Sequence, residues 1–127
     1  MPKITQLGRT MIPVSDQDAA IAFYTEKLGF TVAADIPFGD GDDRWVEVAP
    51  PGGGASIALT TPMGDWQPGR VTGIGLESSD ARADREELAS SGVELDGELM
   101  GGDGTVPLLF SFKDQDGNSL MVAEVQG

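Results

Sequence analysis

The chain of 127 residues contains no histidine, no cysteine and only one tyrosine. Neutral imidazole and thiolate are the usual protein ligands of zinc and the later transition metals, so the common sites for these ions are excluded. Imidazole is also the side chain best suited to proton transfer near neutral pH. Acid–base chemistry would therefore depend on a carboxylate, a lysine or Tyr24.

Basic residues are scarce as well. Eight lysines and arginines stand against 21 acidic residues, and the net charge is −13. Binding to nucleic acid or to anionic membranes requires clustered lysine and arginine, so we expect neither as a partner. The acidic balance has two interpretations: solubility or a salt-adapted host, or an electric field that attracts a cationic small molecule.

Long apolar runs are missing too. None approaches the roughly 20 residues that span a bilayer, and the first residues lack the apolar stretch of a signal peptide. We therefore expect a cytoplasmic protein, and the absence of cysteine fits a reducing compartment. The hydrophobic share of 39% is ordinary for a globular protein, and the length suits one domain with its own core.

Two segments share one pattern, residues 9–16 (RTMIPVSD) and residues 73–80 (GIGLESSD). Each is typical of a strand that ends at a helix cap, and a helical stretch, a terminating glycine (Gly29 or Gly92) and an apolar strand start follow. The remainder of each half alternates as strands do, between turns rich in glycine and proline. We predict a single domain, residues 1–127, made of two βαβββ modules at about 4–61 and 70–126 with a linker at 62–69.

Within these modules, helices are predicted from Ser15 or Asp16 to Gly29 and from Asp80 to about Ser90. Strands are predicted at 44–49 and 55–61 in the first module, and at 95–100, 106–113 and 119–125 in the second. Alternation along the strands predicts one core face. Its members are Ile12, Val14, Ile57, Leu59, Ile74, Leu76, Leu120 and Val122.

Four segments carry a family resemblance: IPVSD (12–16), AIAFY (20–24), LGF (28–30) and FSFKDQDGNSL (110–120). With the internal repeat they resemble the vicinal oxygen chelate superfamily, which includes glyoxalase I, extradiol dioxygenases and bleomycin-resistance proteins. The resemblance implies an α+β fold, in which the modules form a curved mixed sheet with helices outside and a concave cleft inside. It also implies a homodimer.

Metal-using relatives bind one divalent ion with four side chains on the concave face. By position, these side chains correspond here to Arg9, Ala58, Gly73 and Met121. Arg9 would repel a cation, alanine and glycine offer no donor, and the Met121 thioether is too soft for hard divalent ions. The resemblance therefore implies that the metal chemistry is lost and that no cofactor is bound.

The sheet face opposite the core is expected to form the cleft. Trp45 is the leading candidate there, because indole stacks on flat ligands and attracts cations, although half-buried packing explains it equally well. The candidate ligand-binding residues are Arg9, Met11, Phe38, Trp45, Glu47, Ser56, Trp66, Phe110 and Met121.

Several of these candidates have a second interpretation. Trp66 lies in the predicted linker and would be a lid over the cleft or, slightly favoured, a dimer contact. Phe110 is favoured as core rather than as ligand contact, and methionine at 11 and 121 is an adaptable cleft wall or simply core. The acidic loop 35–43, with Asp35, Asp40, Asp42 and Asp43 around Phe38, either rims the cleft or is a solvated connection.

The leading functional hypothesis is a metal-free protein that sequesters a small organic molecule, with a cationic antibiotic as the candidate. The alternative is a lyase, isomerase or dioxygenase-like enzyme of the same superfamily that acts without the usual metal site. Glu47 or Tyr24 would then be its acid or base, although Tyr24 is expected on a helix away from the cleft. A third hypothesis is an interaction module whose dimer interface is the functional surface.

Overall fold

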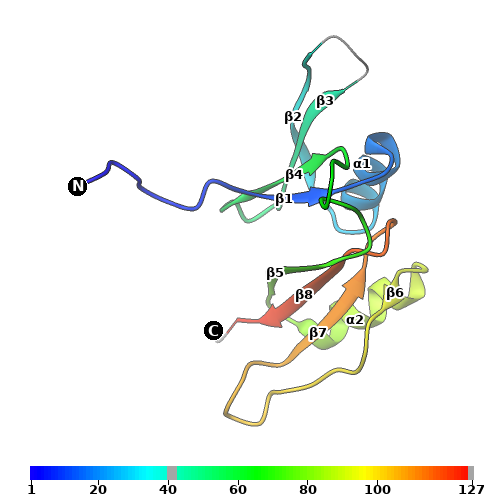
Figure 1. Cartoon of the computed structure of the whole chain (residues 1–127). Coiled ribbons are helices and arrows are strands. Elements are labelled where there is room, and N and C mark those ends of the chain that lie inside the picture. The colour runs from blue at the N-terminus through cyan, green and yellow to red at the C-terminus, as the bar shows by residue number, and fades with distance from the viewer. Residues whose placement is uncertain (40–42, 126–127) are drawn as a thin grey trace. The chain divides into compact units, whose positions relative to one another are not determined.

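The computed structural model describes residues 1–39 and 43–125 and divides the chain into two compact units, Met1–Gln67 and Pro68–Gly127. Each unit contains a strand, a helix and three further strands in that order (Figure 1). The first unit has β1 (Arg9–Pro13), α1 (Gln17–Glu26), β2 (Thr31–Pro37), β3 (Arg44–Ala49) and β4 (Ser56–Thr60). The second has β5 (Val71–Ser78), α2 (Ala81–Ser90), β6 (Glu94–Leu95), β7 (Leu109–Lys113) and β8 (Ser119–Glu124).

Both units form a mixed four-stranded sheet, so the predicted α+β fold of two βαβββ repeats is confirmed. The strand order is β1-β4-β3-β2 in the first unit and β5-β8-β7-β6 in the second. In each sheet the first strand of the unit pairs in parallel with the last, and the other pairings are antiparallel.

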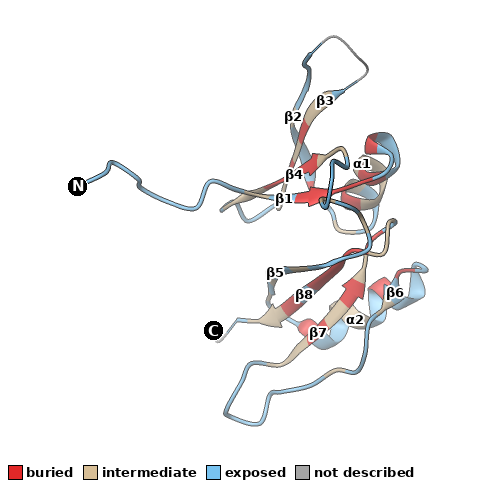
Figure 2. Ribbon diagram, viewed as in Figure 1, coloured by how far each residue is buried: buried red, intermediate tan, exposed pale blue. Residues whose placement is uncertain are grey.

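One face of the first sheet is buried beneath α1. Figure 2 shows buried stretches in β1, β3 and β4, where alternate side chains point into this core. These side chains are Ile12, Val46, Val48, Ile57 and Leu59, and Val14 just after β1 is buried with them. From α1, Tyr24 is fully buried, with its ring centroid 5.4 Å from that of Phe23 and 6.0 Å from that of Phe30. Tyr24 therefore belongs to the core and not to the open face of the sheet.

The predicted helix boundaries are confirmed to within a few residues. The Asp16 carboxylate accepts the N–H of Ala19 at 3.1 Å, and Asp80 does the same for Ala83 at 3.1 Å. After α1 the chain turns at Gly29, whose φ of 76° is readily available to glycine. Within the described residues, no helix is long and apolar enough to cross a membrane.

The second sheet is covered by α2, and Phe110, Phe112, Leu120 and Val122 are buried in its core. Ile74 and Leu76, also predicted as core, are only half-buried. The predicted strands at 95–100 and 106–113 were too long, because β6 ends at Leu95 and β7 begins at Leu109. Gly97, inside the predicted strand 95–100, has a positive φ, which is incompatible with an extended strand. Beyond β6 the segment contacts β7 through a hydrogen bond from the Asp96 N–H to the Ser111 carbonyl at 2.9 Å and through the Met100–Leu109 bridge.

Gln17 ties α1 to the sheet. Its buried side-chain amide donates to the carbonyl of Arg44 at 2.7 Å and to the carbonyl of Leu59 at 2.9 Å. The two carbonyls belong to β3 and β4, so one side chain fixes both strands against the helix start.

We predict that Gln17→Ala lowers the free energy of unfolding by about 1–3 kcal/mol, because two backbone carbonyls lose a buried donor. Urea denaturation measures the change. Gln115→Ala is the matched control, since the exposed Gln115 amide contacts the neighbouring Asp116 carboxylate and ties no elements together. Equal stability of the two variants would contradict this role of Gln17.

Candidate functional site

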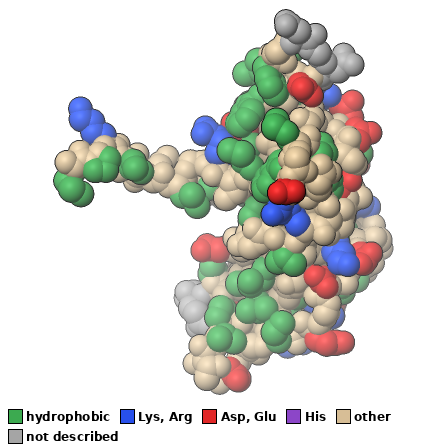
Figure 3. Space-filling model, in the orientation of Figure 1, with side chains coloured by type: hydrophobic (Ala, Val, Ile, Leu, Met, Phe, Trp, Pro, Cys, Tyr) green, Lys and Arg blue, Asp and Glu red, His purple; other side chains and the backbone are tan. Residues whose placement is uncertain are grey.

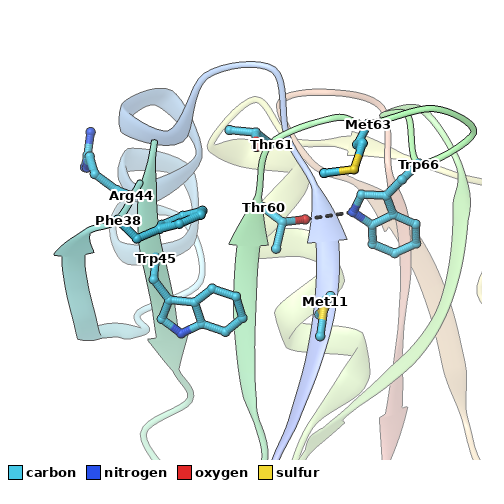
Figure 4. A pocket seen from close by; sticks show the side chains of 8 residues that line it. All are labelled: Met11, Phe38, Arg44, Trp45, Thr60, Thr61, Met63 and Trp66. Atoms are coloured by element: carbon cyan, nitrogen blue, oxygen red, sulfur yellow. Dashed lines mark hydrogen bonds between the residues drawn. The ribbon is translucent and has the colours of Figure 1, made fainter. Parts of the chain in front are cut away.

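The open face of the first sheet carries a pocket of about 420 Å³, which lies in the size range of small-molecule sites. Its lining comes entirely from the first unit and is mostly apolar (Figure 4). The lining residues are Met11, Phe38, Arg44, Trp45, Thr60, Thr61, Met63 and Trp66. Hydrophobic side chains remain exposed around it, with Phe38 and Met11 both 49% exposed, and Figure 3 shows many such side chains on the molecular surface.

Two tryptophans define the walls of this pocket. Trp45 projects from β3, and Trp66 follows β4 in a short turn in which Met63 and Trp66 exchange backbone hydrogen bonds of 3.0 and 2.8 Å. The Trp66 indole Nε1–H donates to the Thr60 Oγ1 at 2.7 Å (Figure 4). Trp66 therefore belongs to the first unit, where the sequence predicted a linker. Its proposed contact with a second subunit stays a prediction.

Beside the pocket, Glu47 is the centre of a polar cluster on the same face. Its Oε2 accepts the Trp45 indole Nε1–H at 2.6 Å and the Arg9 Nε–H at 3.3 Å, and its Oε1 accepts the Ser56 hydroxyl. The side chain of Glu47 is only 13% exposed. The hydrogen bond from Ser56, then that from Trp45, then the charge of Arg9 lower the pKa of Glu47 below its ordinary value of 4.5. Glu47 is therefore a stable anion at neutral pH and a weak base.

At the other side of the pocket, Arg44 is held by two carboxylates. Its Nη1 lies 2.9 Å from Asp18 Oδ1, and its Nε lies 2.9 Å from Asp35 Oδ1. The hydrogen bonds with Asp35 and then Asp18 raise the pKa of Arg44, and the same contact lowers the pKa of Asp35. Arg44 thus contributes a guanidinium whose charge is already balanced.

The structure brings together some of the residues predicted from the sequence. Met11, Phe38, Trp45 and Trp66 line the pocket, and Arg9, Glu47 and Ser56 lie next to it on the same face. Two candidates lie in the second unit. Phe110 is fully buried there, as the favoured core interpretation held, and cannot contact a ligand from that position, whereas Met121 on β8 is 37% exposed.

The predicted acidic loop needs a correction. Asp35 lies on β2 and pairs with Arg44, so it is part of the sheet and not of a loop. Asp40 and Asp42 lie outside the described residues. The Phe38 N–H donates a hydrogen bond to the Asp43 carbonyl at 3.1 Å, so these two residues lie side by side.

Sequence reasoning missed four residues of the pocket, Arg44, Thr60, Thr61 and Met63. Thr60 could have been found, because it is two residues beyond Ala58 and must share its face of β4. Met63 gave no such signal, since its place depends on the turn that pairs it with Trp66.

The comparisons with known proteins agree with this architecture. Residues 6–122 match the model of the Glyoxalase/Bleomycin resistance protein/Dioxygenase superfamily, and the chain belongs to this family. It is 35% identical to the uncharacterized protein YetH of Bacillus subtilis (strain 168) over 123 residues, which covers 95% of this chain and 99% of YetH.

Two solved structures show the same fold. TnmS3, an antibiotic binding protein from Streptomyces sp. CB03234, has a TM-score of 0.84 and 33% identity, with 99% of this chain and 100% of TnmS3 covered. A superfamily member from Sphaerobacter thermophilus DSM 20745 has a TM-score of 0.83 and 32% identity, with 96% and 98% covered.

The residues at the metal-ligand positions of this family do not fit a metal ion. Arg9 forms an ion pair with Glu47, Ala58 is fully buried without a donor atom, and Met121 presents a thioether. Gly73 has no side chain. Across residues 1–39 and 43–125, no three histidine, cysteine, aspartate or glutamate side chains gather where they could hold an ion.

We predict that Glu47→Gln makes stability less dependent on acid. The folded-state pKa of Glu47 is depressed, so its stabilising effect is complete above the ordinary pKa of 4.5 and is lost as pH falls through the lower, folded value. Glu47→Gln should therefore be less stable than the parent at neutral pH, and the difference should shrink below pH 4.5.

Urea midpoints at a series of pH values measure this difference. Ser56→Ala is the companion variant, since losing the hydroxyl raises the pKa of Glu47 and moves the loss of stability to higher pH. A stability difference that does not change with pH would refute the assignment.

Proposed function

We propose that the protein binds and sequesters a small organic molecule in the pocket on the open face of the first sheet, without a metal ion. The observation that carries this proposal is that Trp45 and Trp66 both line one pocket of about 420 Å³. Indole rings offer broad faces for contact with flat ligands, and Met11 and Met63 add adaptable walls.

The polar groups around the pocket support binding more than catalysis. The two oxygens of Glu47 accept hydrogen bonds from Ser56, Trp45 and Arg9, and its lowered pKa makes it a poor proton acceptor near neutral pH. Tyr24, the other candidate for acid–base work, is buried in the core. Neither of the two residues that the enzyme hypothesis names is therefore suited to proton transfer at the pocket.

The charge of the chain supports a cationic ligand. A net charge of −13 creates a field that concentrates cations, and indole faces attract them at close range. The similarity to TnmS3, an antibiotic binding protein, supports an antibiotic or a comparable compound as the ligand. We also propose a homodimer, as the family resemblance implies, and a cytoplasmic location.

We predict that proflavine, a flat tricyclic cation, binds more tightly than anthracene carboxylate, a flat tricyclic anion of similar size. Added salt should weaken proflavine binding and reduce the difference between the two probes, because it screens the field of the protein. Isothermal titration calorimetry at two salt concentrations measures both effects. Tighter binding of the anion would contradict the cationic ligand, and binding of neither probe would contradict the site itself.

Variants locate the binding. Trp45→Ala and Trp66→Ala should each weaken proflavine binding by about tenfold, since each removes a ring face worth roughly 0.5–2 kcal/mol. Val71→Ala, a change at an 81% exposed residue of the second unit, is the control and should leave the affinity unchanged. Equal affinities in all three variants would place the binding elsewhere.

Metal removal provides a separate test. We predict that dialysis against EDTA leaves proflavine binding unchanged, because the side chains at the family's metal positions supply no ligand set. Elemental analysis of the purified protein should find no stoichiometric divalent ion. An ion that co-purifies at one per chain and restores binding when returned would overturn this part of the proposal.

A further inference from the structure

Both tryptophans of the pocket direct their only polar atom at a protein partner. The Trp45 Nε1–H donates to Glu47 Oε2 at 2.6 Å, and the Trp66 Nε1–H donates to Thr60 Oγ1 at 2.7 Å. The Thr60 hydroxyl in turn donates to the Ile12 carbonyl at 3.2 Å. Neither indole N–H is therefore available to an acceptor on a ligand.

We infer that Glu47 is a positioning residue: it holds the Trp45 indole by its N–H, so that the pocket recognises its ligand through the ring face. This inference rests on the proposed function of the same pocket. It assigns Glu47 a role in specificity although its side chain does not line the cavity.

The geometry of Glu47 suits that role. Oε1 accepts the Ser56 hydroxyl from β4, and Oε2 accepts both Trp45 on β3 and Arg9 on β1, so three strands fix one carboxylate. Among the described residues, Arg9 is the charged side chain paired with Glu47. Ala58 on β4 and Ala34 on β2 are its cross-strand neighbours and carry no charge.

A carboxylate is a better partner for this purpose than a neutral acceptor. Hydrogen bonds to ionised acceptors are stronger, so the indole orientation is held more firmly before the ligand arrives. The negative charge also pushes electron density into the indole, which strengthens its attraction for a cationic or electron-poor ring. Trp66 differs, since its partner Thr60 is neutral. The pocket thus pairs one activated indole with one ordinary indole.

The first test uses the free protein and does not depend on any ligand. Heteronuclear NMR of isotope-labelled protein gives one indole N–H signal for each of the two tryptophans, and Trp66→Phe assigns them. At neutral pH, Glu47→Gln should shift the Trp45 signal and leave the Trp66 signal in place. On acidification of the parent, the Trp45 signal alone should titrate, with a midpoint below 4.5.

Ser56→Ala keeps the Trp45 hydrogen bond but removes one that stabilises the Glu47 anion, so it should raise that midpoint. If Glu47 only stabilised the fold, its protonation would not change the Trp45 indole signal selectively. The inference is overturned if the Trp45 signal is the same in Glu47→Gln as in the parent, or if both indole signals move together.

The second test measures affinity for proflavine. Glu47→Ala removes the charged hydrogen-bond partner of Trp45 and should weaken binding about tenfold, in line with one charge-assisted hydrogen bond. Thr60→Val removes the neutral partner of Trp66 with little change in size and should weaken binding less. Wild-type affinity in Glu47→Ala would overturn the inference, whereas failure of the parent to bind proflavine would count against the proposed function and leave the NMR result standing.

Discussion

The pocket depends on one constraint of β-structure, the alternation of side chains along a strand. In β1, β3 and β4, Ile12, Val46, Val48, Ile57 and Leu59 are buried on the face toward α1, and the residues between them point to the opposite, open face, where Ala58 is covered by its neighbours. The register aligns Met11, Ala58 and Glu47 across three neighbouring strands. A shift of one residue in β3 would place Val46 and Val48 on the open face and bury the charge of Glu47.

Charge balance is the second feature of this face. Despite the net charge of −13, the charged side chains described next to the pocket are paired: Glu47 with Arg9, and Arg44 with Asp18 and Asp35. The surplus acidic charge acts over longer distances, where it influences which molecules approach. Apart from the paired Arg44, the pocket lining offers mostly aromatic rings, thioethers and methyl groups. In the proposed function, long-range attraction and short-range recognition would therefore depend on different residues.

Much of the fold could be predicted from the sequence because its signals are local. Asp16 and Asp80 cap the helices, Gly29 turns the chain, and alternation assigned Val46 and Val48 to the core opposite Trp45 and Glu47. Alternation also predicted two pocket residues, Met11 and Trp45. The predicted strand at 95–100 was too long, because Gly97 adopts a positive φ that alternation of side chains does not reveal.

The partners of each side chain could not be predicted, because they depend on strand pairing between distant residues. Nothing in the sequence brings Arg9 to Glu47 or Gln17 to the carbonyl of Leu59. The contact of Trp66 with Thr60 could not be predicted either, because a segment with two prolines and two glycines is also typical of a linker. The lowered pKa of Glu47 follows from these contacts and was therefore equally out of reach.

The small size of the Ala58 side chain has a consequence for substitutions at this position. Ala58 occupies a position that carries a metal ligand in metal-using relatives, and Glu47 is now its direct cross-strand neighbour. A glutamate at position 58 would set two like charges side by side, which β-sheets tolerate poorly. Ala58 is also fully buried, so a larger side chain at this position would have to displace its neighbours as well. The arrangement around Glu47 therefore restricts position 58 to a small, uncharged residue.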